Sequence, residues 1–89
     1  MTDDGVHPPD LSVVVVSYNV AGLLRRCLAS VVRSLGRSSL AFEVLVVDNA
    51  SADGSAEMVE AGFPQVSLLQ NRTNRGFAAA TNQALALSR

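Results

Sequence analysis

Three short polar segments each follow a run of apolar residues, and they hold most of the side chains that could bind or transform a ligand. They are Ser17-Tyr18-Asn19, Asp48-Asn49-Ala50-Ser51 and Gln70-Asn71-Arg72. In open α/β sheets, ligands bind outside the carboxyl ends of the strands. If the apolar runs are strands of such a sheet, we expect the three segments to line one rim, and that rim is the expected ligand site.

Asp48 is the most informative residue of this rim. It directly follows the apolar run 44–47, which places its carboxylate at the mouth of the predicted sheet. There it could accept a hydrogen bond from a ligand N–H. Asp-Asn pairs are also common turn formers, so position alone leaves a turn or capping role equally open.

Two glycine-containing segments could bind an anion. Asp53-Gly54-Ser55 would place free backbone N–H groups at a helix start, although the same residues form an ordinary capping sequence, which is the favoured interpretation. Asn74-Arg75-Gly76 combines a predicted N-cap, Asn74, with a guanidinium suited to a phosphate oxygen. Gly76 would let a ligand approach closely. A capped helix with a surface arginine explains this second segment equally well.

The elements that must position these residues alternate along the chain. Apolar runs at 11–16, 42–47 and 66–69 predict strands, and the lack of polar alternation in the first indicates burial on both faces. Helical spacing of apolar residues predicts helices over about 23–35 and over 77–87. A short helix is also predicted between them, after Ser55 and ending at Gly62. Right-handed crossovers between such strands require a three-stranded parallel sheet. The predicted fold is therefore α/β, a three-layer βαβαβα arrangement.

Residues flanking and within these elements complete the domain organisation. Residues 1–10 contain Gly5, Pro8 and Pro9 and are predicted to form a flexible tail, so that His7 has no role and the domain covers 11–89. Cys27 falls within the apolar stripe of the first helix and is predicted to be a small core residue. As a single cysteine it cannot form an internal disulfide, which fits a reducing compartment.

Composition and missing motifs exclude several classes of function. Apolar residues make up 48% of the chain and the net charge is −1, so no strong field attracts nucleic acid or an anionic membrane. The sequence has no apolar run of 18 residues and no apolar segment typical of a signal peptide, so we expect a cytoplasmic protein. Dinucleotide-binding and P-loop glycine motifs are absent, as is any Cys/His pair with metal-ligand spacing.

Three motifs in this chain resemble those of the family-2 glycosyltransferases, which have a GT-A fold. The first is Val13-Val14-Val15-Val16-Ser17-Tyr18-Asn19, the opening strand. The second, running from Val46 to Ser55, is similar to V-D-[DN]-x-S-x-D-G-[ST]. The third, running from Asn71 to Asn82, is similar to N-x-G-F-[AG]-x-x-x-N. Together and in this order, the motifs cover nearly all of residues 11–87.

The resemblance implies that a nucleotide-diphosphate sugar binds here for transfer to an acceptor hydroxyl, on a saccharide or a lipid-linked acceptor. It implies that Asp48 hydrogen-bonds a pyrimidine ring and that the Gly-Phe-Ala segment lies near the sugar phosphate. The motif positions implied to bind substrate are Ser17, Tyr18, Asn19, Asp48, Asn49, Asp53, Asn74, Arg75, Gly76 and Asn82. The Asn-Ala-Ser and Gly-Phe-Ala segments are similar to those of the rhamnosyltransferase-like branch, which suggests a UDP- or dTDP-linked donor. The expected location is cytoplasmic, extending to the inner face of the membrane.

The chain departs from the family pattern in one respect. A strand ending in a D-x-D motif should follow the last helix, and its carboxylates would bind Mg²⁺ or Mn²⁺. Neither this motif nor the later general base occurs in the 89 residues, so we expect no catalytic or metal-binding residue here and an inactive segment. The alternative is a non-catalytic nucleotide-binding or partner-dependent module. In either case an exposed sheet edge would favour a homo-oligomer. An unrelated flavodoxin-like domain is a weaker third option.

Overall fold

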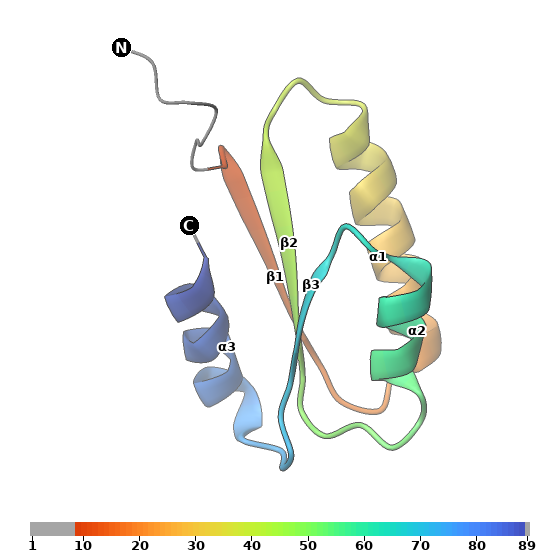
Figure 1. The fold of residues 1–89 in the computed structure, drawn as a ribbon, viewed down its shortest axis with the longest axis vertical. Helices are drawn as coiled ribbons and strands as arrows, with labels where there is room; N and C mark the ends of the chain where they lie inside the picture. The colour runs from red at the N-terminus through yellow and green to blue at the C-terminus, as the bar shows by residue number, and fades with distance from the viewer. Residues whose placement is uncertain (1–8, 89) are drawn as a thin grey trace.

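The computed structural model describes residues 9–88, in which strands and helices alternate as predicted (Figure 1). The elements are β1 (Leu11–Ser17), α1 (Ala21–Gly36), β2 (Phe42–Asp48), α2 (Ser55–Gly62), β3 (Ser67–Gln70) and α3 (Gly76–Leu87). His7 and most of the predicted N-terminal tail lie outside the described residues. Asp10, the last residue of that predicted tail, pairs with Ala41 through backbone and side-chain hydrogen bonds.

The three strands form one parallel sheet in the order β1-β2-β3. Ser17 is the register partner of Asp48, and Asp48 is the register partner of Gln70. The last residues of all three strands therefore lie in one row across the sheet. This register aligns the three polar segments that follow the strands.

Helices cover both faces of the sheet, which confirms the three-layer α/β fold. α1 and α2 lie on one face and α3 lies on the other (Figure 1). The core under α1 and α2 contains Leu28, Val46 and Val59, whereas Val47 packs with Ala80 and α3 on the opposite face. Because consecutive strand residues point to opposite faces, a strand covered on both sides has to be apolar throughout.

The central strand is the only one of the three that is buried along most of its length. Residues 44–48 of β2 are all buried, whereas residues 13–16 of β1 are only half-buried. The expectation that the first strand is buried on both faces holds in part: Val13 and Val15 pack against the core on one face and Val14 and Val16 against the core on the other, but burial is incomplete. The physical reason is its position, since β1 has a neighbouring strand on one side only.

The apolar stripe of α1 is narrower than its sequence predicted. Leu24 and Leu28 are buried against the sheet, but Leu23 is 63% exposed. Cys27 is also exposed, so the prediction of a core cysteine is wrong. A helix turns by about 100° per residue, which places Cys27 about 60° away from Leu24 around the axis.

Within residues 9–88, no helix combines the length and apolar character needed to cross a bilayer.

Candidate functional site

Three loops meet at the carboxyl ends of the strands, at the bottom of the view in Figure 1. They comprise residues 18–20, 49–54 and 71–75. We call these loops, together with the flanking residues Ser17, Asp48 and Gly76, the rim. Backbone hydrogen bonds continue the sheet by one residue into it. The N–H of Asn49 donates to the carbonyl of Ser17 at 2.8 Å, and the N–H of Asn71 donates to the carbonyl of Asp48 at 2.9 Å. These hydrogen bonds hold the first residues of the second and third loops to the ends of the neighbouring strands.

Asp48 lies at the centre of the rim and is only 3% exposed. Its Oδ2 accepts a hydrogen bond from the N–H of Ser51 at 2.9 Å. Its Oδ1 and the hydroxyl of its register partner Ser17 are both buried, and neither has a hydrogen-bond partner among residues 9–88. A buried polar group without a partner costs about 1–3 kcal/mol, so this pair marks a place where a ligand could supply the missing hydrogen bonds.

Asn19 ties the first rim loop to the second. Its backbone has a φ of 52°, a left-handed conformation that asparagine tolerates better than most residues. Its N–H donates to the hydroxyl of Ser51 at 2.8 Å, and its Oδ1 accepts the N–H of Ala52 at 2.7 Å. In this structure the side chain of Asn19 therefore links the first loop to the second.

Asp53 joins the same two loops at the starts of their helices. Its Oδ2 accepts the N–H of Ala21, the first residue of α1, at 2.9 Å. Its Oδ1 accepts both the N–H and the hydroxyl of Ser55, the first residue of α2. The Ser55 hydroxyl, followed by the Ala21 N–H, lowers the pKa of Asp53. One exposed carboxylate therefore supplies acceptors to two helix N-termini, which otherwise lack partners for their first N–H groups.

A network of side-chain amides connects the second and third rim loops to α3. Asn49 is 2% exposed, and its Oδ1 accepts a hydrogen bond from Asn71 at 2.9 Å. Asn71 and Gln83 exchange two further hydrogen bonds, of 2.8 and 3.0 Å. Sequence reasoning missed Gln83. The available signal was its position directly before Ala84, a residue of the predicted apolar face of this helix.

The third loop ends at the start of α3, one residue later than predicted. Asn74 is not the N-cap, because Arg75 occupies that position. Asn74 instead accepts the N–H of Gly76 with its Oδ1 at 2.8 Å, a local turn that short polar side chains favour. Gly76 has a φ of 80°, a backbone conformation that favours glycine.

The remaining predicted site residues are exposed. Tyr18 is 50% exposed, and Arg75 is also exposed beside the rim. Asn82 lies farther away, six residues into α3 and about 9 Å along the helix from Gly76. The rim therefore brings together all the predicted residues except Asn82.

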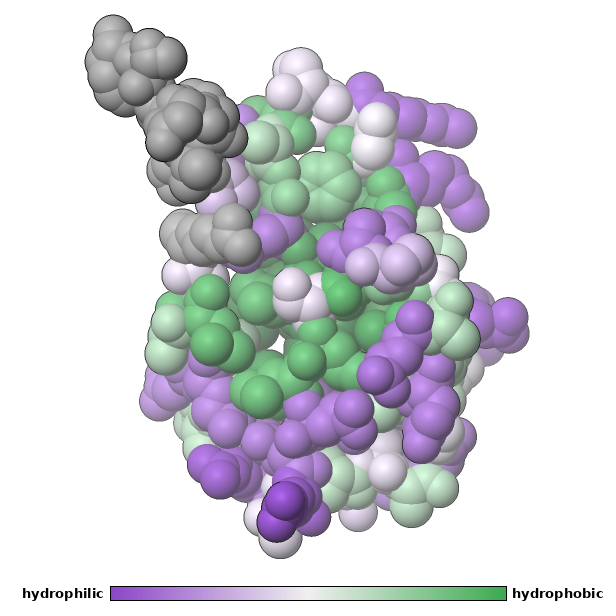
Figure 2. Space-filling view, viewed as in Figure 1, coloured by the Kyte–Doolittle hydropathy of each residue, from purple (hydrophilic) through white to green (hydrophobic). Residues whose placement is uncertain are grey.

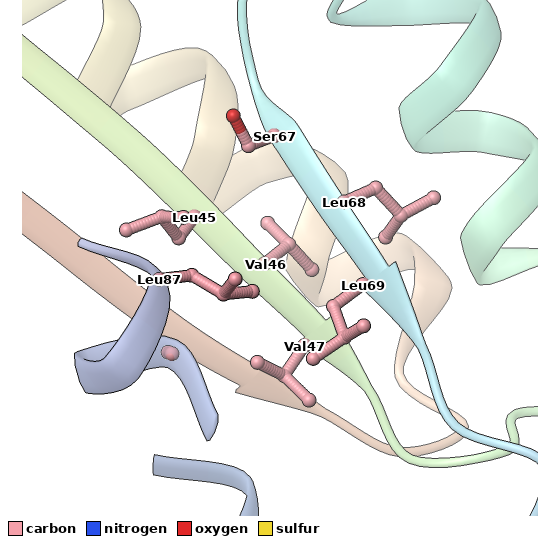
Figure 3. Close-up of a pocket in the computed structure, with 8 residues that line it drawn as sticks. Leu45, Val46, Val47, Ser67, Leu68, Leu69 and Leu87 are labelled. Atoms are coloured by element: carbon pink, nitrogen blue, oxygen red, sulfur yellow. The ribbon is translucent and has the colours of Figure 1, made fainter. Parts of the chain in front are cut away.

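The residues described by the structure offer no cluster of side chains for a metal ion. No group of three or more His, Cys, Asp or Glu side chains within residues 9–88 could hold a metal ion. An apolar pocket of about 70 Å³ lies elsewhere, where Val47, Leu69 and Leu87 point toward one another between α3 and the sheet (Figure 3). Polar residues instead gather at the rim end of the molecule (Figure 2).

Comparison with known proteins identifies relatives of this arrangement. The model of glycosyl transferase family 2 matches residues 12–89. The succinoglycan biosynthesis protein ExoU of Rhizobium meliloti is 34% identical over 84 residues, covering 91% of this chain and 23% of that protein. The N-acetylglucosaminyl-diphospho-decaprenol L-rhamnosyltransferase of Mycobacterium tuberculosis is 36% identical over 76 residues, covering 85% of this chain and 24% of that protein.

A solved structure shows the same fold. The mannosyltransferase PcManGT from Pyrobaculum calidifontis, in complex with GDP-Man and Mn²⁺, superposes with a TM-score of 0.72 at 29% sequence identity. The match covers 99% of this chain and 27% of that one, so the chain spans about a quarter of the length of its relatives. The expected GT-A fold and the resemblance to rhamnosyltransferases are confirmed. Because the family model covers nearly all of the sequence, this chain belongs to glycosyl transferase family 2.

Proposed function

We propose that this chain is the donor-binding portion of a glycosyltransferase and binds a nucleotide-diphosphate sugar at the rim. The observation that carries the proposal is the buried Oδ1 of Asp48, which lies beside the Ser17 hydroxyl and has no partner among the described residues. Unpartnered polar atoms are uncommon in folded proteins. Their location at the carboxyl ends of parallel strands is the usual ligand position in open α/β sheets.

The chemistry of Asp48 favours a pyrimidine base. Its Oδ2 already accepts the Ser51 N–H, which leaves one oxygen without a partner. One acceptor fits the single ring N–H of uracil or thymine, and a guanine edge offers two adjacent donors. The neighbouring Ser17 hydroxyl can donate to a ring carbonyl. Because both atoms are buried, the side chains that cover them have to shift when the base enters. We therefore propose a UDP- or dTDP-linked donor.

The third rim loop supplies the groups that suit a diphosphate. Arg75 presents an exposed guanidinium directly before α3, and guanidinium groups bind phosphate oxygens through paired hydrogen bonds. The N-terminus of α3 adds backbone N–H groups and a positive dipole end. On the opposite side of Asp48, the half-exposed ring of Tyr18 can pack against the base or ribose.

The proposed role of these residues is binding the donor rather than performing the transfer. PcManGT was solved with Mn²⁺, and we propose that the complete enzyme likewise uses Mg²⁺ or Mn²⁺. The carboxylates among residues 9–88 do not fit such an ion, so its ligands lie outside the described residues. The rhamnosyltransferase relative is named for a lipid-linked acceptor. A saccharide or lipid-linked acceptor is accordingly proposed here, and a non-catalytic module that retains only donor binding remains the alternative.

Calorimetric titration with UDP, dTDP and GDP tests this proposal. We expect UDP or dTDP to bind in preference to GDP, and Asp48→Ala to weaken that binding by about 10- to 100-fold, the value of a hydrogen bond to a charged group. Asp10→Ala is the matched control, because it removes the same charge at the other end of the sheet, where Asp10 bonds Ala41. Folded protein that binds neither pyrimidine nucleotide would refute the proposal, as would equal affinities in the two variants.

A further inference from the structure

We infer that Asn49 is a positioning residue, whose side-chain amide fixes both ends of the 71–76 loop to the end of β2. Its effect on ligand binding rests on the function proposed above. The loop contains Arg75 and Gly76, the groups assigned to the diphosphate. In this interpretation Asn49 acts through the loop and does not touch the ligand.

The Asn49 amide contacts the loop at its start and at its end. Its Oδ1 accepts hydrogen bonds from the side chain of Asn71 at 2.9 Å and from the N–H of Arg75 at 3.4 Å. Its Nδ2 donates to the carbonyl of Gly76 at 3.2 Å. The two contacts at the end of the loop are longer than the one at its start, but both involve the same planar amide. A single buried side chain therefore spans the whole loop.

The backbone of Asn49 provides a rigid base for these contacts. Its N–H is bonded to the carbonyl of Ser17, and the carbonyl of the preceding residue, Asp48, is bonded to the N–H of Asn71. Consecutive side chains at a strand end point to opposite faces of the sheet. Asp48 thus serves the proposed base site, while Asn49 serves the loop on the α3 side. Adjacent residues hold the two halves of the donor site in register.

Among residues 9–88, few other side chains contact the end of the loop. Residues 72–76 are exposed, and the other side-chain contact at the end of the loop is the local bond between Asn74 and Gly76. Gln83 bonds Asn71 and so anchors only the start of the loop. Without Asn49, the segment carrying Arg75 would have to be ordered when the ligand binds, and ordering flexible residues lowers affinity.

Backbone relaxation measured by NMR tests the structural part of the inference without any ligand. We expect order parameters at residues 75–76 to fall from about 0.85 to about 0.6 or below in Asn49→Ala. Asn49→Asp keeps the acceptor but places an oxygen opposite the Gly76 carbonyl, and should show the same loss at residue 76. Gln83→Ala is the matched control, since it removes an amide from the same network and should leave residues 75–76 ordered.

Unchanged order parameters at residues 75–76 in both Asn49 variants would overturn the inference. A loss of the same size at these residues in Gln83→Ala would also overturn it, because it would show a general loosening of the network. Circular dichroism establishes that each variant is folded. If Asn49→Ala does not fold, Asn49→Asp decides the question, because it has nearly the same size and shape.

Titration with UDP and with uridine then separates the two parts of the proposed site. We expect Asn49→Ala to weaken UDP binding about tenfold, the value of roughly two lost hydrogen bonds, and to leave uridine binding unchanged. An equal loss for both ligands would mean that Asn49 supports Asp48, which contradicts the inference. If the unaltered protein binds neither, the proposed function fails, while the relaxation experiment still decides whether Asn49 holds the loop.

Discussion

The carboxylate of Asp53 accepts the backbone N–H of Ala21 at 2.9 Å, across a separation of 32 residues. The same carboxylate also accepts hydrogen bonds from the first residue of α2. Asp53 therefore fixes the start of α1 relative to the start of α2. It also fixes the two loops that lead into these helices from the ends of β1 and β2. The geometry of the rim depends on this link as well as on the sheet.

The first prediction concerns the pH dependence of stability. Because the folded-state pKa of Asp53 is lowered, its ionised form stabilises the protein above the unfolded-state pKa, and this contribution is lost as the pH falls through the folded-state pKa. Asp53→Asn mimics the protonated form. We expect it to lower the melting temperature at pH 7, and the two proteins to converge as the pH falls below about 4.

Thermal unfolding followed by circular dichroism from pH 7 to pH 2.5 measures this convergence. Glu60→Gln is a suitable control, since it removes one exposed carboxylate from the other end of α2. If the difference between Asp53→Asn and the unaltered protein stays constant over the whole range, the hydrogen bonds to Asp53 do not depend on its charge.

The second prediction concerns the left-handed backbone of Asn19. Asn19→Gly loses the hydrogen bond to Ala52 but accommodates the φ of 52°, whereas Asn19→Ala loses the bond and adds backbone strain. We expect the alanine variant to be less stable than the glycine variant by about 1 kcal/mol. Urea unfolding measures both free energies, and a more stable alanine variant would contradict the assigned conformation.

The third prediction distinguishes the two sides of α1. Cys27 is exposed, so a maleimide reagent should label it in the folded protein without denaturant, and Cys27→Ser should change the free energy of unfolding by less than about 0.5 kcal/mol. Leu28, its neighbour, is fully buried, and Leu28→Ala should cost about 2–5 kcal/mol. Labelling that requires unfolding would show that Cys27 belongs to the core after all.

The fourth prediction concerns the outer surface of α3. This helix contains no charged residue, and its Phe77, Leu85 and Leu87 side chains are more than half exposed. Large apolar side chains that gather on one exposed surface often mark a contact with another protein, so we expect concentration-dependent self-association of the 89-residue chain. Leu85→Glu should lower the average mass in sedimentation equilibrium. An unchanged mass would exclude this surface and direct attention to the sheet edges, where the homo-oligomer was predicted.

The sequence was most informative about the sheet. Continuous β-branched runs identify strands that helices cover, and a polar residue directly after such a run has to lie at the strand end. Asp48 could therefore be placed at the rim from its position alone. The α3 start was predicted to within one residue, because the turn residues around Gly76 restrict where the helix can begin.

The partners of the rim side chains could not be predicted in this way. The bonds of Asn19 to Ser51 and Ala52, and of Asp53 to Ala21, join residues 32 or 33 positions apart. Which of them meet depends on strand register and on the paths of two loops. The same limit applies to Gln83, whose role depends on where α3 lies across the sheet. Strand-end position thus identifies the rim, but it does not separate side chains that face a ligand from those that brace the loops.

The placement of α3 also determines which strand lies at the middle of a larger sheet. α1 and α2 connect successive strands on one face, whereas α3 returns across the other face and contacts β1 and β2. For a right-handed crossover, a parallel strand reached through α3 has to add beside β1. The direction of winding would then reverse at β1, turning it from a boundary into an interior strand. The crevice created by such a reversal opens beside Ser17, next to the carboxylate of Asp48.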